Sequence, residues 1–129
     1  MLVSRKPIPI SRLAALAVSF AVAFGAAAGA AHAQEKFAVE GTNPGSTKVD
    51  YTGEVSVTKS GQTWQFEWQV GGAPIKGTGI IMDGTHVAIA GLFDGKPFVF
   101  ILKKEGAKFV GSWSTAGSDK TGREVWTPK

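Results

Sequence analysis

The sequence contains no cysteine among its 129 residues. This absence excludes disulfide bonds, thiolate metal sites and cysteine nucleophiles, so packing alone must stabilise the fold. Histidine is scarce as well, and beyond residue 33 only His86 is present. A lone histidine cannot build a metal site or a catalytic triad without partners, and no suitably spaced partners follow it. We therefore expect no metal, no cofactor and no catalytic residues.

Clustered basic charge is also sparse. The formal net charge of +4 comes from 14 Lys and Arg against 10 Asp and Glu, and without Arg5, Lys6 and Arg12 the balance is 11 against 10, or +1. The densest basic point, at 103–108, is typical of a solvated hairpin end. The composition therefore does not predict nucleic-acid binding.

Residues 1–33 have the features of a secretory signal peptide. A basic start is followed by an Ala-rich apolar run over 13–31 and by small residues in "AHA" at 31–33. We predict cleavage after Ala33, a mature chain of residues 34–129 without a membrane span, and a periplasmic or secreted location. The alternative is an uncleaved anchor, because the apolar run is nearly long enough to cross a bilayer.

Beyond residue 33 the sequence lacks helical periodicity and has regular turn signals instead. Pairs ending in glycine recur at 60–61, 71–72, 83–84, 94–95 and 105–106, between runs rich in Val, Ile, Thr, Phe and Trp. This rhythm predicts one all-β domain, an antiparallel up-and-down meander of about eight strands that forms a closed or nearly closed barrel. A two-sheet sandwich is the alternative. The expected strands cover 36–40, 48–59, 62–70, 75–82, 85–93, 96–104, 107–114 and 122–127.

The turn lengths set which side chains face inward. A three-residue turn, Asp83-Gly84-Thr85, places Val87 and Ile89 inside, whereas a two-residue turn would enclose His86 and Ala88 instead. We prefer the first, because two-residue turns elsewhere then keep the aromatic rows on the same face. Several glycines also face inward opposite rings in this register: Gly53 opposite Trp68, Gly91 opposite Phe98, and Gly111 opposite Phe100.

The inner aromatic face has two interpretations. Rings that lie over glycines fill a core, and an eight-stranded barrel has little room beyond its side chains. Alternatively, the glycines hollow out a pocket for an apolar ligand. The residues that would line such an interior site are Trp64, Phe66, Trp68, Phe100 and Trp113.

The outer face carries an unusual apolar row. In the predicted register Ile80, Ala88, Ile101 and Val110 lie side by side, and such a row on a monomer often marks a contact surface. Alternatively, another segment covers the row, or the fold is a sandwich. In the last strand we expect Val125 to face inward, which keeps Glu124 in water and exposes Trp126, unless the strand is shifted by one. The predicted partner-binding surface is Ile80, Ala88, Ala90, Val99, Ile101, Val110 and Trp126.

One pair of carboxylates, Glu54 and Glu67, is predicted to face each other on the polar outside. Two carboxylates at such a separation could serve a glycosidase. However, Lys76 is expected beside Glu67, and an exposed flat surface does not give the desolvation that a catalytic acid needs. We interpret the three residues as a surface charge ladder.

Five short motifs carry a resemblance that covers nearly the whole mature chain: "YTG" at 51–53, "WQFEW" at 64–68, "GTG" at 77–79, "GSW" at 111–113 and "GREVWTP" at 122–128. They resemble a family of short exported proteobacterial proteins that are uncharacterised or labelled fibronectin-binding-like. The resemblance implies an exported β domain and supplies no ligand residues. "GSW" also resembles the Gly-x-Trp of lipocalin and avidin-type barrels, where that motif belongs to the first strand.

The sequence thus leads to two functional predictions. The first is a non-enzymatic, exported binding module that acts through its surface on a protein partner, possibly a host matrix protein, or on a second copy of itself. The alternative is a small barrel that binds an apolar small molecule in its interior.

Overall fold

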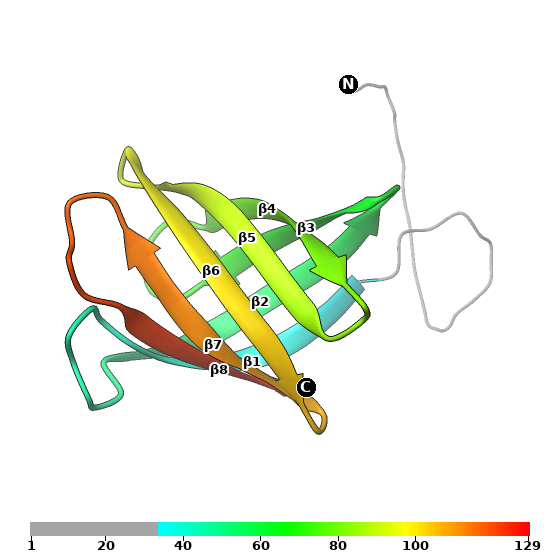
Figure 1. Ribbon diagram of the computed structural model, residues 1–129, viewed down its shortest axis with the longest axis horizontal. Helices are drawn as coiled ribbons and strands as arrows, with labels where there is room; N and C mark the ends of the chain where they lie inside the picture. The colour runs from blue at the N-terminus through cyan, green and yellow to red at the C-terminus, as the bar shows by residue number, and fades with distance from the viewer. Residues whose placement is uncertain (1–33) are drawn as a thin grey trace. The chain divides into compact units, whose positions relative to one another are not determined.

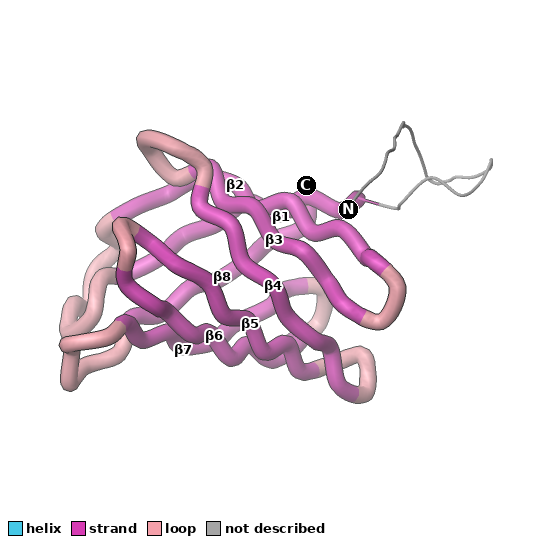
Figure 2. The backbone as a smooth tube through the Cα atoms, turned by 90° about the horizontal axis from the view of Figure 1, so that it is seen from above, coloured by secondary structure: helices cyan, strands magenta, loops and turns pink. Residues whose placement is uncertain are grey.

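The computed structural model describes residues 34–129, and the predicted signal peptide at 1–33 lies outside the described residues. Eight antiparallel strands each pair with the next, and the first pairs with the last to close a barrel (Figures 1 and 2). Residues Glu35–Val57 and Gly61–Lys129 form one compact unit, and the site described below lies within it. The strands are β1 (Gln34–Thr42), β2 (Tyr51–Ser60), β3 (Thr63–Gln69), β4 (Ile75–Met82), β5 (His86–Phe93), β6 (Lys96–Glu105), β7 (Lys108–Thr115) and β8 (Gly122–Pro128). The prediction of an all-β meander closed into a barrel is confirmed.

Alternating apolar and polar residues give each strand one inner and one outer face. In β3, for example, Phe66 and Trp68 are buried while Gln65 and Gln69 are exposed. The burial of these apolar faces against one another is the main stabilising contribution in a chain without disulfides. The buried core consists of Phe37, Val39, Val55, Val57, Phe66, Trp68, Val87, Ile89, Phe98, Phe100, Leu102 and Trp126.

The three-residue turn between β4 and β5 is confirmed. Asp83 and Gly84 have positive φ angles of 57° and 66°, and the register that follows pairs Met82 with His86. Val87 and Ile89 are consequently buried, at 2% and 3% exposure. The strands that follow this turn therefore begin with the inward-facing side chains that the sequence predicts.

Two of the other turns begin one residue later than predicted. They consist of Gly61-Gln62 and Gly106-Ala107, and their glycines have φ angles of 63° and 64°. Glycine thus occupies the first central position, as in a type II′ turn, and not the second position that we had assumed. The change shifts the pairing of the two adjoining strands by two residues. Each side chain therefore stays on its predicted face but lies opposite a different residue of the neighbouring strand.

The predicted pairing of two glycines was therefore wrong. Gly111 lies opposite Leu102, and Trp113 instead lies opposite Phe100. Gly53 was expected opposite Trp68, but a side chain placed at Gly53 would meet Val70 Cγ1 at 2.5 Å. The predicted pairing of Gly91 with Phe98 is confirmed.

The inward glycines accommodate rings. A Cβ atom at Gly91 would lie 2.6 Å from Phe98 Cζ, and one at Gly79 would lie 3.1 Å from Phe66 Cε1. Real Cβ atoms do not approach carbon at the first of these distances, so the missing side chain at Gly91 makes room for an aromatic neighbour. The middle of the barrel is thus filled with side chains, as the core interpretation expected.

The connections divide the barrel into two ends. The loops at 43–50, 70–74, 94–95 and 116–121 lie at one end, which we call the loop end; its loops at 43–50, 94–95 and 116–121 are seen on the left in Figure 1. The turns at 61–62, 83–85 and 106–107 lie at the other. Within residues 34–129 the structure has no helix with the length and apolarity that a membrane span requires.

Candidate functional site

The last strand faces the opposite way from our prediction. Trp126 is buried, with 1% exposure, and Glu124 is buried with 3% exposure, while Val125 lies on the outer face. Trp126 is therefore not part of an outer contact surface, and the alternative of a strand shifted by one is correct. The physical reason is that burying a tryptophan contributes more than burying a valine, provided that Glu124 finds hydrogen-bond partners inside.

Three donors surround the Glu124 carboxylate. Its Oε2 atom accepts a hydrogen bond of 2.6 Å from the Tyr51 hydroxyl. Its Oε1 atom accepts two more, from the indole N–H groups of Trp126 at 2.8 Å and Trp68 at 3.1 Å. The carboxylate thus joins β2, β3 and β8 across the barrel interior.

Glycines on both neighbouring strands leave space around this carboxylate. Glu124 pairs with Gly41 of β1 and with Gly111 of β7, so no side chain flanks it within the wall. The ring of Tyr51 occupies the space over Gly41, where a Cβ atom would collide with it. The phenol is thereby held against the carboxylate.

Stacked rings form an aromatic layer beside the polar cluster. The ring centroids of Trp68 and Phe100 are 5.2 Å apart, and those of Phe100 and Trp113 are 5.8 Å apart, with interplanar angles of 28° and 17°. Trp113 is half-buried near the loop end, and its indole N–H donates to the Thr42 carbonyl at 3.2 Å. Trp68, Phe100 and Trp113, three of the five predicted interior residues, therefore meet in one stack.

The other two interior residues also face inward. Phe66 is buried, with a ring centroid 6.0 Å from that of Trp126. Trp64 is half-buried opposite Gly79, at the start of β3, near the end of the barrel opposite the loop end. The rings of the site are predictable from the sequence, whereas its polar centre, Glu124, was predicted to lie in water. The larger size of Trp126 relative to Val125 was the one feature of the sequence that favoured an inward Trp126 and hence an inward Glu124.

Burial raises the pKa of both partners in the hydrogen bond between Glu124 and Tyr51. Burial raises the pKa of Glu124 above its ordinary value of 4.5, although the hydrogen bonds from Tyr51, Trp126 and Trp68 act against this. Burial, together with the negative charge of Glu124, raises the pKa of Tyr51 well above 10.0 and keeps the phenol protonated. Tyr51 therefore stays a donor to the carboxylate.

We predict that stability falls as the pH rises from 4.5 through the pKa of folded Glu124. The folded state holds this proton to a higher pH than the unfolded state, so unfolding releases a proton in this interval and becomes easier. Each unit of pKa difference corresponds to about 1.4 kcal/mol. Tyr51 is the only titratable side chain bonded to Glu124 among residues 34–129, and it titrates far above this interval.

Urea unfolding at pH 5 and pH 8 measures this effect. The free energy of unfolding is expected to be higher at pH 5, and the difference should shrink in Glu124→Gln. Asp50, whose pKa is lowered by the backbone N–H of Asn43, contributes in the opposite direction but only below its ordinary value of 3.8. An unchanged pH dependence in the variant would contradict the assignment to Glu124.

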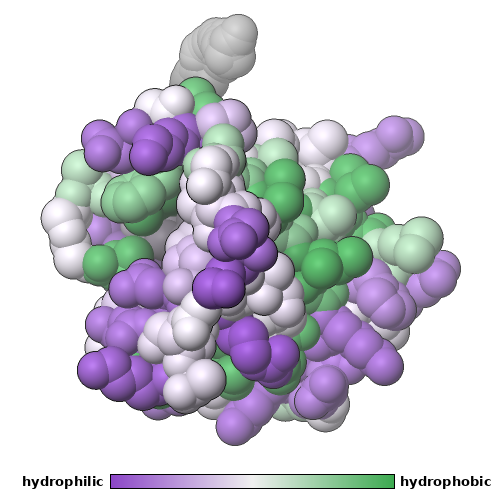
Figure 3. Space-filling model, turned by 60° about the vertical axis from the view of Figure 1, so that its left-hand side comes forward, coloured by the Kyte–Doolittle hydropathy of each residue, from purple (hydrophilic) through white to green (hydrophobic). Residues whose placement is uncertain are grey.

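The predicted outer row is exposed but shorter than expected. Ile80, Val99 and Ile101 are 59%, 55% and 60% exposed, and Ala88 pairs with both Ile80 and Ile101. Val110, however, pairs with Lys103 because of the shifted β6–β7 turn, so it does not continue the row. Apolar residues gather on one side of the barrel between polar ones (Figure 3).

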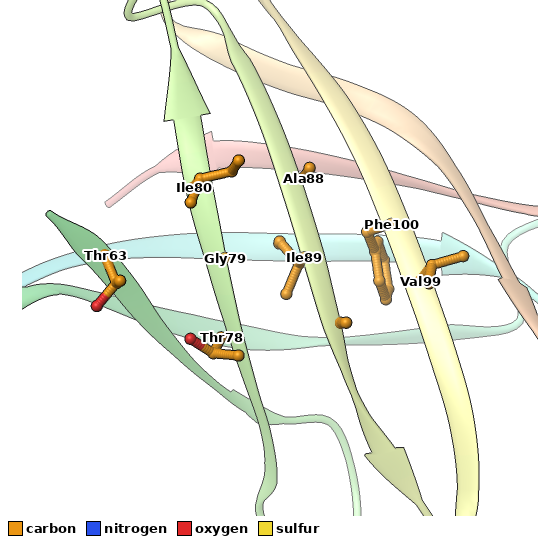
Figure 4. Close-up of a pocket in the computed structure, with 9 residues that line it drawn as sticks. Thr63, Thr78, Gly79, Ile80, Ala88, Ile89, Val99 and Phe100 are labelled. Atoms are coloured by element: carbon orange, nitrogen blue, oxygen red, sulfur yellow. The ribbon is translucent and has the colours of Figure 1, made fainter.

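A hollow of about 360 Å³ lies on the outer face of strands β3 to β6. Figure 4 shows Thr63 and Thr78 at one edge and Val99 at the other. The amide of Gln65 lies 3.4 Å from the Thr63 hydroxyl and 3.1 Å from the Thr78 hydroxyl. The lining residues are Thr63, Thr78, Gly79, Ile80, Ala88, Ile89, Ala90, Val99 and Phe100.

The outer hollow and the interior differ in their polar groups. The hollow is open and apolar, and its two hydroxyls lie at one edge beside the same glutamine side chain. The interior has a buried carboxylate with converging donors next to a stack of rings. Ligand sites combine an apolar lining with a few convergent polar groups, so the interior is the better candidate.

The carboxylates considered for catalysis are engaged on the outer face. Glu54 forms an ion pair of 3.2 Å with Lys129, and Glu67 lies opposite Lys76, as predicted. The shifted β2–β3 turn moves Glu54 away from Glu67, so the predicted facing of these two carboxylates is wrong and only the Glu67–Lys76 part of the charge ladder is confirmed. In the part of the chain that the structure describes, no three His, Cys, Asp or Glu side chains are grouped so that they could hold a metal ion.

Comparisons with known proteins give structural similarity only. No family model and no curated protein matches the sequence. Lipid binding protein 8 of Caenorhabditis elegans has a TM-score of 0.49 and 9% identity, covering 74% of this chain and 94% of that one. The REP1-NXSQ fatty acid transporter has a TM-score of 0.48 and 13% identity, with coverages of 74% and 94%. The fatty acid-binding protein from Drosophila melanogaster brain has a TM-score of 0.46 and 13% identity, with coverages of 72% and 96%.

The structure corrects the leading functional prediction, which was a surface module for a protein partner or a second copy of the chain. Trp126, the only aromatic residue of the predicted surface, is buried, and the convergent polar groups lie inside the barrel. The alternative, a barrel with an apolar small ligand, is the better supported of the two. The resemblance to fibronectin-binding-like proteins and the exported location stay predictions.

Proposed function

We propose that this chain is a non-enzymatic binding protein that holds a small apolar molecule at the loop end of its barrel. The observation that carries the proposal is the convergence of Tyr51, Trp68 and Trp126 on the buried carboxylate of Glu124. A buried titratable group with a shifted pKa, set in an aromatic interior, is a common mark of a binding site.

The loop end supplies the apolar contacts. Tyr51, Ile75 and Trp113 face inward there and are only half-buried, so a ligand can reach them without entering the filled middle of the barrel. Phe93, at the end of β5, is 58% exposed beside the turn at 94–95. An exposed ring at the loop end favours contact with apolar molecules.

A neutral apolar dye, N-phenyl-1-naphthylamine, tests the proposal. We expect its emission to rise with saturation at one dye per chain, and tryptophan emission to fall as the dye accepts its energy. Trp113→Ala should weaken binding by about tenfold, because the variant loses part of the ring stack that the dye contacts.

A variant of the outer hollow separates the two candidate locations. Val99→Ser changes a hollow residue that is 55% exposed, and it should leave dye binding unchanged. Loss of binding in Val99→Ser with full binding in Trp113→Ala would place the ligand outside the barrel. No saturable binding of any apolar probe would contradict the proposed function itself.

A further inference from the structure

The donors at the interior site are already used. The Tyr51 hydroxyl, the Trp68 indole and the Trp126 indole all donate to Glu124. The remaining indole nearby, that of Trp113, donates to the carbonyl of Thr42. None of these four donor groups is therefore free to donate a hydrogen bond to a ligand head group.

Acceptor capacity remains at the same place. A carboxylate has about four lone-pair positions, of which Glu124 uses three. The phenol oxygen of Tyr51 also accepts, and the indole of Trp113 already acts on it as a hydrogen-bond donor, which leaves one further lone pair. The Tyr51 side chain is half-buried near the loop end, and its hydroxyl oxygen lies 2.6 Å from Glu124 Oε2. The site thus offers acceptors to a ligand.

The charge of the site points the same way. Glu124 is the one charged side chain in the buried set of residues 34–129. The three side chains that hydrogen-bond to it, those of Tyr51, Trp68 and Trp126, are all uncharged aromatic residues. A buried carboxylate without a cationic neighbour is costly, and a positive group brought by a ligand would offset that cost.

We propose that the ligand is an amphiphile with a protonated amine head, which hydrogen-bonds to the oxygens of Tyr51 and Glu124 while its apolar body lies against the Trp113–Phe100 stack. This inference rests on the proposed function and specifies its ligand class. A carboxylate head in the same position would face like charge and find no free donor.

Three probes with the same twelve-carbon chain test the inference: dodecylammonium, dodecanol and dodecanoate. Each is measured at pH 7.5 and below its micelle concentration, by displacement of the neutral dye and by calorimetry. We expect dodecylammonium to bind about tenfold or more tighter than dodecanoate, with dodecanol between them. In Glu124→Gln the ratio should fall to near one.

A matched variant controls for the net charge of the chain. Glu40→Gln removes the same charge from an exposed position of β1, next to Gly41 but on the outer face, and it should keep the preference. Should Glu124→Gln fail to fold, as judged by circular dichroism, Tyr51→Phe replaces it. That variant removes the phenol oxygen, and the preference for the amine should fall in it as well.

The outcomes distinguish this inference from the function on which it rests. Equal binding of the three probes, tighter binding of dodecanoate, or loss of the preference in Glu40→Gln would overturn the amine assignment and leave an apolar site in place. No binding of any of the three, together with no dye binding, would overturn both.

Discussion

Trp68→Ala is expected to lower the free energy of unfolding by about 3–5 kcal/mol, the range for removing a buried tryptophan. Trp68 is 2% exposed, and its ring centroid lies 5.2 Å from that of Phe100, 5.7 Å from that of Phe98 and 6.1 Å from that of Trp126. The variant also loses one of the hydrogen bonds to Glu124. Because small domains are stable by only about 5–15 kcal/mol, a large share of the stability is at risk.

Urea unfolding monitored by circular dichroism measures this loss. Trp68→Phe retains a ring but no N–H group, so its smaller loss separates packing from hydrogen bonding. Ile101→Ala, on the outer face at 60% exposure, is the control and should change stability by less than about 0.5 kcal/mol. Similar losses in Trp68→Ala and Ile101→Ala would mean that the interior stack does not hold the fold together.

The sequence was sufficient to predict the facing of strands β2 to β7, because short turns transmit side-chain phase from one strand to the next. The three-residue turn at Asp83-Gly84-Thr85 is the clearest case, since it alone puts Val87 and Ile89 inside. The turns at Gly61 and Gly106 were predicted one residue too early, but this error did not change which side chains face inward. A shift of two residues restores the same side chains to the same side, although it changes their partners.

The facing of β8 could not be predicted in this way. The loop at 116–121 is irregular, so its length does not relate the inward-facing residues of β7 to those of β8. The facing of β8 therefore had to be predicted from its own residues. Keeping Glu124 in water looked favourable because an isolated buried carboxylate is costly. That cost is offset by donors from Tyr51 and Trp68, which are 73 and 56 residues away along the chain. Such a long-range arrangement is visible only in the folded structure.

The polar centre of the site was missed for the same reason. Tyr51 lies on the inner face, but the sequence analysis assigned its partner Glu124 to the outside, so the two residues were not connected. The aromatic lining was recognised because alternation within β3, β6 and β7 is a local signal. The lining is therefore encoded in single strands, whereas the site depends on how the barrel closes.

Glu124→Leu is expected to lower the free energy of unfolding by about 3–5 kcal/mol. Leucine has a similar volume but no acceptor, so the Tyr51 hydroxyl and the indoles of Trp68 and Trp126 would be left without a partner inside the barrel. A buried donor without an acceptor costs about 1–3 kcal/mol, and three of them outweigh what is gained by removing a buried charge. The measurement is again urea unfolding, at pH 7.5.

Two further variants show whether the loss comes from the orphaned donors. Glu124→Gln retains an oxygen for the two indoles and should cost only about 1 kcal/mol. Combining Glu124→Leu with Tyr51→Phe removes one orphaned donor, so the double variant should be more stable than the sum of the single losses predicts. Wild-type stability in Glu124→Leu would mean that the carboxylate is dispensable for folding. Strict additivity in the double variant would mean that Tyr51 and Glu124 are not coupled.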